Sequence, residues 1–183
     1  EDERRIDTAL EIIDGQGSLA LDLNGMMSQE EAGLFIQKIG DRDFAWIEEP
    51  VGPLDFEATK AVAGSTNIPI ATGENLFSAE DTRNLLLYGG LRPNRDILQM
   101  DISLSYGIVE YLRILDELKR HGWQRTQCAP HAGHLLAFNT VAGLGLGLHE
   151  TTPYGPLSSV SNVRDGVAQL TTSPGVGFEN HPS

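Results

Sequence analysis

The sequence predicts an α/β fold in which parallel strands alternate with helices and lead toward a barrel. Three short apolar segments each end in an acidic residue, and these residues, Asp22, Glu48 and Glu74, are equally spaced along the chain. A strand, a helix and their loops take roughly 25–35 residues, so each repeat returns the chain to the same edge of a sheet. The chain has 183 residues, whereas a complete barrel needs about 250. We therefore expect part of a barrel with three carboxylates at one rim.

Helical segments are indicated by apolar spacing and by capping residues. Apolar residues at helical spacing predict that the chain opens with a helix, and Ser28 with Glu31 forms a capping box before the next one. Ser78 with Asp81 starts a further helix, and the two glycines at positions 89 and 90 end it. The predicted helices cover residues 2–13, a segment from Ser28, residues 55–63, a segment from Ser78, residues 107–120 and residues 135–147.

Short apolar runs between these helices predict strands. Their alternation with helices favours parallel βαβ units with right-handed crossovers. The predicted strands are residues 18–24, 43–50, 68–75, 96–101, 126–130 and a short one ending at Glu150. We expect residues 1–152 to form the barrel part. Residues 153–183 are rich in Pro, Gly, Ser and Asn, and we expect them to leave the barrel, with a final turn and short strand at 173–179.

Composition excludes several function classes. The formal net charge of −13 argues against nucleic acid or an anionic membrane as a partner, because both would repel this surface. The only cysteine, Cys128, excludes an internal disulfide and a cysteine zinc site. No apolar run approaches the ~18 residues of a membrane span. We expect a cytoplasmic location.

Six successive strand ends carry residues suited to chemistry. Asp22, Glu48 and Glu74 offer oxygen ligands for a hard cation such as Mg²⁺, with solvated loop carboxylates as the alternative. The later strand ends carry Asp101, His131 and Glu150. Each of these three residues could instead have a structural role. Asp101 could cap a turn, His131 could be a packed or capping histidine, and Glu150 could be a solvated loop acid. A zinc site at the two histidines of the segment 131–134 is disfavoured, because zinc-binding pairs on a helix stand four apart with a third ligand.

The strings LDLNG, WIEEP, TGEN, QMD, APH and LHE occur at these strand ends in this order. With them the chain resembles the enolase superfamily, specifically its mandelate racemase subgroup. Residues 71–123 are similar to the tartrate dehydratase branch of the acid-sugar dehydratases. The resemblance implies a TIM-type (β/α)7β barrel, here incomplete, and a tail that packs on a capping domain.

The resemblance also implies roles for single residues. Asp22, Glu48 and Glu74 match the Mg²⁺ ligands. His131 matches the catalytic histidine, and Asp101 matches its aspartate partner. Glu150 matches an acid near the substrate carboxylate. Removing the proton beside a carboxylate creates an enediolate, which a divalent cation stabilises. The histidine can then protonate a departing hydroxyl group. The implied activity is Mg²⁺-dependent dehydration of a hydroxy acid such as tartrate or an acid sugar, by an enzyme that we expect to be a homo-oligomer.

One expected feature is absent from the chain. The resemblance places a Lys-x-Lys pair, the general base, roughly thirty residues before the first metal ligand, which would precede Glu1. The lysines present, Lys38, Lys60 and Lys119, lie on predicted helices. We therefore expect the base, the first two strands and the capping domain to belong to an N-terminal region of the same protein or to another polypeptide. A racemase or epimerase on the same scaffold and a non-catalytic binding module remain the alternatives.

Overall fold

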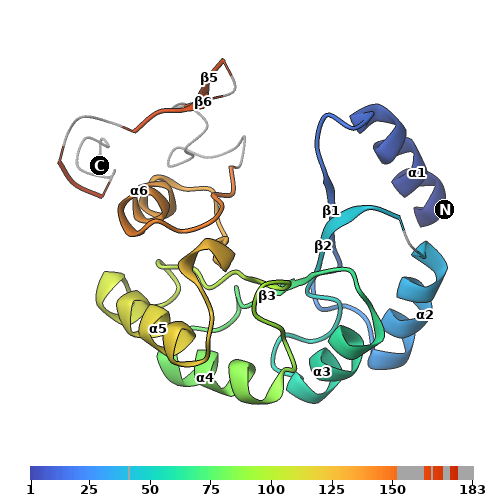
Figure 1. Ribbon diagram of the computed structural model, residues 1–183, viewed down its shortest axis with the longest axis horizontal. Coiled ribbons are helices and arrows are strands. Elements are labelled where there is room, and N and C mark those ends of the chain that lie inside the picture. The colour runs from blue at the N-terminus through green and yellow to red at the C-terminus, as the bar shows by residue number, and fades with distance from the viewer. Residues whose placement is uncertain (41, 152–162, 166, 171–173, 177–183) are drawn as a thin grey trace. The chain divides into compact units, whose positions relative to one another are not determined.

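The computed structural model describes residues 1–40, 42–151, 163–165, 167–170 and 174–176 (Figure 1). These residues form two compact units. The first unit contains Glu1–Thr72 and Asn84–Ile97, and the second contains Gly73–Arg83 and the described residues from Leu98 onward. None of the helices in the described ranges is long and apolar enough to cross a membrane.

The first unit is built on parallel strands in sequential order. Strand β2 pairs in parallel with both β1 and β3, and at its centre Ile47 is the register partner of Ile70. Both isoleucines are fully buried. Three predicted strands are confirmed here, each a few residues shorter than expected. The strands are β1 (Leu19–Asp22), β2 (Phe44–Glu48), β3 (Ile70–Thr72) and, next in the order, β4 (Ile97–Leu98).

Two helices of the first unit, α2 and α3, begin at residues whose side chains cap them. Ser28 and Glu31 form the expected capping box, with reciprocal side-chain and backbone hydrogen bonds. Asp55 caps the next helix by accepting a hydrogen bond from the backbone N–H of Ala58 at 2.9 Å. Helices α2 and α3 lie side by side (Figure 1). The three helices wholly within this unit are α1 (Asp2–Ile13), α2 (Gln29–Ile39) and α3 (Phe56–Ser65).

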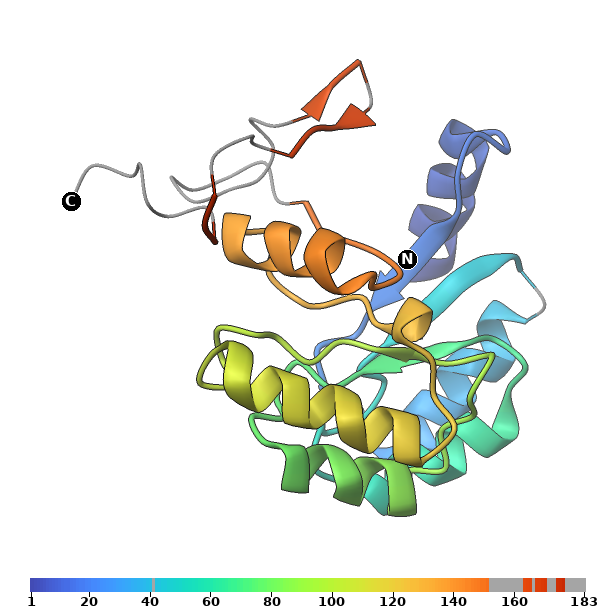
Figure 2. The ribbon, with the colours of Figure 1, turned by 60° about the vertical axis from the view of Figure 1, so that its left-hand side comes forward.

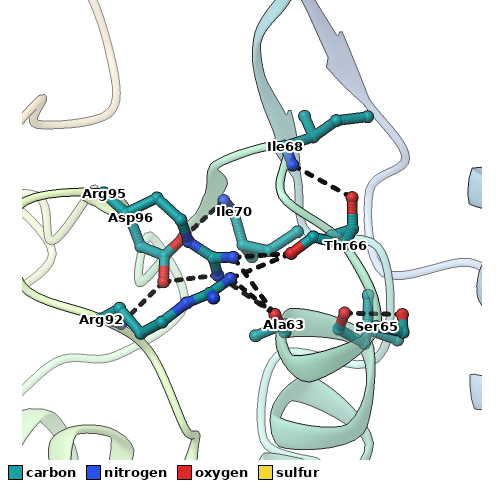
Figure 3. Close-up of polar contacts among 9 residues, drawn as sticks. Ala63, Ser65, Thr66, Ile68, Ile70, Arg92, Arg95 and Asp96 are labelled. Carbon is teal, nitrogen blue, oxygen red and sulfur yellow. Dashed lines mark hydrogen bonds and ion pairs between the residues drawn. The ribbon is translucent and has the colours of Figure 1, made fainter. Parts of the chain in front are cut away.

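A buried carboxylate connects the start of β3 to the segment before β4. Asp96 is fully buried and accepts hydrogen bonds from the backbone N–H groups of Ile70 at 2.9 Å and Arg92 at 2.7 Å. Arg95 donates to both oxygens of this carboxylate, at 2.7 and 2.8 Å. The same guanidinium donates to the carbonyl oxygen of Ala63 on α3 (Figure 3). We call this group the Asp96 network.

Asp96→Asn is expected to lower the free energy of unfolding of the full-length protein by about 3 kcal/mol, because it leaves the Arg95 charge without its buried partner. Urea denaturation measures this change. Asp2→Asn is the matched control, since that carboxylate forms an exposed ion pair with Arg5 at 3.4 Å, and such pairs contribute little. Equal denaturation midpoints for the two variants would contradict the prediction.

The described residues of the second unit form two complete α-helices, one short 3-10 helix and part of a further α-helix. Helix α5 buries one apolar stripe, formed by Tyr111, Ile114, Leu115 and Leu118. The first residues of α4 also belong to this unit, where the backbone N–H of Ala79 donates to Glu110 at 2.9 Å. The helical elements are α4 (Ala79–Tyr88), α5 (Ile108–Arg120), the 3-10 helix η1 (Arg125–Gln127) and α6 (Leu135–Leu144).

The predicted strand at 126–130 is wrong in its first half. Residues 125–127 form η1, and parallel pairing begins only at Cys128, which bridges Leu98. The pairing then continues, because the backbone N–H of Ala129 donates to the carbonyl oxygen of Leu98 at 2.9 Å. The short strand expected before Glu150 is also wrong, since residues 145–150 contain no strand.

Two further boundaries differ from expectation. Helix α6 ends at Leu144 rather than at 147, because Gly145 adopts a left-handed conformation with φ of 66°. An antiparallel strand pair that was not predicted is formed by β5 (Val163–Arg164) and β6 (Val167–Ala168), seen in red in Figure 2. The expected boundary at 152–153 and most of the expected strand at 173–179 lie outside the described residues.

Candidate active site

Asp22 and Glu48 end two neighbouring parallel strands of the first unit. They are register partners across β1 and β2, so their side chains project from the same face at the carboxyl end of the sheet. Asp22 is exposed and Glu48 is partly buried. Parallel pairing thus places two carboxylates on adjacent strands of one unit.

Neutral donors hold both carboxylates in place. The two oxygens of Asp22 accept from Asn24, one from its backbone N–H at 2.8 Å and one from its side-chain amide at 2.7 Å. Asn24 has a φ of 49°, a left-handed conformation that asparagine tolerates. Glu48 Oε2 accepts from the indole N–H of Trp46 at 3.0 Å. Trp46 therefore orients a candidate ligand.

The donor set suits a divalent cation. Both groups are hard oxygen ligands of the kind that Mg²⁺ prefers, and no Lys or Arg side chain in the described residues forms an ion pair with either of them. The Lys and Arg side chains that do form ion pairs in these residues have other carboxylate partners: Glu1, Asp2, Glu3, Asp7, Asp96, Glu110 and Glu117. Two adjacent carboxylates without a protein cation fit the predicted metal ligands.

In the second unit, Glu74 lies close to His131. A glycine immediately before Glu74 makes this segment possible: Gly73 has a φ of 123°, and a Cβ there would lie 2.7 Å from Met100 Sδ. Glu74 Oε2 is 3.5 Å from His131 Nε2. The sequence predicted that Glu74 is a metal ligand and that His131 is the catalytic histidine.

His131 is flanked by carboxylates. Its Nδ1 is 3.8 Å from Asp101 Oδ2, an ion-pair distance that is longer than a hydrogen bond. In the described part of the chain this buried nitrogen has no hydrogen-bond partner. The Asp101 carboxylate, opposed by partial burial and aided by the charges of Glu74 and Glu150, raises the pKa of His131 to about 9. A cationic ring suits a proton donor.

Asp101 is almost fully buried and firmly held. Its Oδ1 and Oδ2 accept from the backbone N–H and the hydroxyl of Ser103, both at 2.8 Å. A second histidine, His134, places Nε2 3.5 Å from Oδ1. Burial alone would raise the pKa of this carboxyl group, but its contacts with the two histidines and the serine outweigh burial and hold the pKa well below its usual value. The carboxylate is therefore charged beside His131.

Glu150 reaches the same cluster from a segment without regular structure. Its Oε2 accepts from the backbone N–H of Ala132 at 2.7 Å, next to the catalytic candidate His131. The residue itself is exposed. Within the second unit the structure thus brings together four predicted residues: Glu74, Asp101, His131 and Glu150.

The complete metal site stays a prediction. Asp22 and Glu48 belong to the first unit and Glu74 to the second. In the described ranges, no group of three or more His, Cys, Asp or Glu side chains is arranged to hold a metal ion. A cavity of about 540 Å³ in the first unit, lined by residues of α2 and by residues 65–68, contains none of the predicted site residues.

Sequence reasoning missed two residues of the second unit. Ser103 binds both oxygens of Asp101, and the signal that could have found it is the spacing of a serine two residues after an aspartate, typical of a local turn. His134 caps α6 and approaches the same carboxylate. It was considered only as a zinc ligand, although its position just before an apolar helical run is that of a cap.

Comparison with known proteins identifies the family of the chain. The sequence matches the family described as enolase C-terminal domain-like over residues 1–183. It is 29% identical over 181 residues to the L-talarate/galactarate dehydratase of Salmonella typhimurium, an alignment covering 97% of this chain and 44% of that protein. The chain thus spans less than half the length of this curated relative.

Solved structures show the same fold. A mutant L-talarate/galactarate dehydratase liganded with Mg and L-glucarate aligns with a TM-score of 0.70 at 29% identity, over 81% of this chain and 36% of that one. A mandelate racemase/muconate lactonizing enzyme from a marine actinobacterium, in complex with magnesium, aligns with a TM-score of 0.78 at 23% identity, over 96% and 50% of the two chains. The chain belongs to the enolase C-terminal domain-like family and has the α/β barrel fold of that family, of which it covers a part.

Proposed function

We propose that the protein to which this chain belongs is a Mg²⁺-dependent dehydratase of an acid sugar or a related hydroxy acid. The observation that carries the proposal is the position of His131 between two carboxylates. Its Nδ1 is 3.8 Å from Asp101 Oδ2, and its Nε2 is 3.5 Å from Glu74 Oε2. The similarity to L-talarate/galactarate dehydratase over 97% of the chain supports the same reaction class.

The reaction removes water without any oxidant. The C–H bond beside the substrate carboxylate breaks, the C–O bond on the next carbon breaks, and the resulting enol tautomerises to a 2-keto acid. We assign the first proton to a base upstream of Glu1, because Lys38, Lys60 and Lys119 are exposed on α2, α3 and α5. His131 gives its proton to the departing hydroxyl group.

Asp22, Glu48 and Glu74 would hold the cation. Bound Mg²⁺ supplies positive charge that stabilises the negative charge developing on the substrate carboxylate. The neutral donors Asn24 and Trp46 orient two of these ligands without competing as cations. Glu150, fixed by the backbone N–H of Ala132, stands beside His131, where we place the substrate carboxylate.

Racemisation on the same scaffold is the second candidate. A racemase must protonate the substrate carbon itself, and in one direction its histidine must take a proton from that carbon. The two reactions differ in whether His131 protonates the departing hydroxyl group or the substrate carbon. The similarity to L-talarate/galactarate dehydratase favours dehydration.

The test is to incubate the full-length protein and Mg²⁺ with galactarate, talarate, glucarate and tartrate. We expect a 2-keto acid, detected as its semicarbazone, and loss of this activity when a chelator removes Mg²⁺. Exchange of the proton beside the carboxylate in D₂O without a keto product would establish a racemase instead. Absence of both reactions, together with Mg²⁺-independent binding of an acid, would establish a binding module.

A further inference from the structure

His134 contacts the same carboxylate as the catalytic candidate His131, through a different oxygen. His131 Nδ1 is 3.8 Å from Asp101 Oδ2, and His134 Nε2 is 3.5 Å from Asp101 Oδ1. The chain turns sharply between the two histidines, where Ala132 has a φ of 66°. Both rings therefore come from one tetrapeptide, residues 131–134, and meet one carboxylate.

The other nitrogen of His134 identifies where its proton lies. His134 is the N-cap of α6, and its Nδ1 accepts a hydrogen bond from the backbone N–H of Ala137 at 3.0 Å. A ring nitrogen that accepts a hydrogen bond carries no proton. Because Nδ1 accepts from Ala137, the ring proton of His134 lies on Nε2.

That proton has an acceptor connected to Asp101. His134 Nε2 is 3.1 Å from the hydroxyl oxygen of Ser103. The same hydroxyl group donates to Asp101 Oδ2 at 2.8 Å. The hydrogen bonds thus run in one direction, from the N–H of Ala137 through the imidazole and the hydroxyl to the carboxylate. Each of these donors is neutral, so the carboxylate keeps its negative charge for His131.

We propose that His134 is a positioning residue: by donating from Nε2 to Ser103 and toward Asp101 it holds the carboxylate in the orientation that faces His131. The proposal rests on the proposed function for its effect on turnover, whereas the hydrogen-bond chain stands independently of it. Helix capping alone would need only Nδ1. Helix capping does not require that Nε2 lie beside Ser103 and Asp101, as it does here.

His134→Asn separates positioning from capping. Asparagine is among the best N-cap residues, so its side-chain oxygen can still accept from Ala137. It has no donor at the place of Nε2, and the contact with Ser103 and Asp101 is lost. In the full-length protein we expect kcat to fall about tenfold, the loss typical of removing a group that orients a functional residue, with KM and the thermal unfolding midpoint unchanged.

Two companion variants sharpen the test. Ser103→Ala breaks the next link, so it should show a similar loss, and the double variant with His134→Asn should lose no more than either alone, as expected for groups that act as a unit. His121→Asn is the matched control, because that histidine caps the end of α5 and contacts Glu117 at 3.8 Å. Unchanged kcat in His134→Asn, or a loss equal to that of the control, overturns the proposal.

A spectroscopic readout keeps the proposal testable without turnover. Long-range ¹H–¹⁵N spectra of the histidine rings in the full-length protein should show His134 neutral, with its proton on Nε2, and His134→Asn should shift the ring signals of His131. A proton on Nδ1 of His134, a cationic ring, or unmoved His131 signals overturns the proposal. If the wild-type protein converts no acid, the proposed function fails while these spectra still decide the role of His134.

Discussion

Glu48→Gln is expected to lower turnover of the full-length protein by about 10³-fold, comparable to the loss of a principal electrostatic contact with the developing charge. The substitution keeps the size of the side chain and an oxygen that can accept from Trp46. It removes one negative charge from the pair that Glu48 forms with its register partner Asp22. Steady-state kinetics over a range of Mg²⁺ concentrations and a calorimetric Mg²⁺ titration measure the effect.

Glu57→Gln is the control for this experiment. Glu57 is an exposed residue in the first turn of α3, so the same chemical change there should alter neither turnover nor Mg²⁺ affinity. If Glu48→Gln kept wild-type Mg²⁺ affinity, Glu48 would not be a ligand, and the carboxylate pair at the ends of β1 and β2 would have another role.

His131→Asn is expected to lower turnover by at least ~10²-fold, because general acid catalysis typically contributes 10²–10⁴. Mg²⁺ affinity should be nearly unchanged, since the role assigned to this ring is proton transfer and not coordination. Asp101→Asn should also reduce turnover, but less, because the ring itself remains. The measurements are kcat with an accepted acid and calorimetric Mg²⁺ binding.

The distance of 3.5 Å between His131 Nε2 and Glu74 makes the Mg²⁺ titration decisive. A folded His131→Asn variant that no longer bound Mg²⁺ would show that the histidine is a ligand, and the division of roles would fail. Circular dichroism establishes folding. His121→Asn again provides the comparison, since it removes a histidine from the same unit at a distance from the cluster along the sequence.

Local patterns predicted much of the first unit because its elements depend on neighbours in sequence. The capping box of Ser28 and Glu31 involves residues three apart, so the start of α2 could be predicted from it. The cap of α3 at Asp55 spans the same short distance. The strands β1 to β3 are apolar runs that end in acids, and their parallel pairing follows from the helices between them. The register of Asp22 and Glu48 is a consequence of that repeat.

The second unit was less predictable because its contacts depend on tertiary structure. The string TQCAP has the composition of a strand, yet its first half forms η1, and only the partner Leu98 determines where pairing begins. Glu150 reaches the cluster through one hydrogen bond to Ala132 rather than by ending a strand. The second contact of His134 involves Ser103, 31 residues earlier in the chain, and no local pattern indicates it.

The Asp96 network has a consequence for how this protein can evolve. It lies at the amino end of β3, where Asp96 binds the N–H of the first strand residue, Ile70, whereas Asp22 and Glu48 stand at the carboxyl ends of β1 and β2. Within this unit, stabilising contacts and candidate ligands are therefore at opposite strand ends. Mutations at the carboxyl ends of β1 and β2 leave the network intact, so selection can vary this rim without first losing the scaffold.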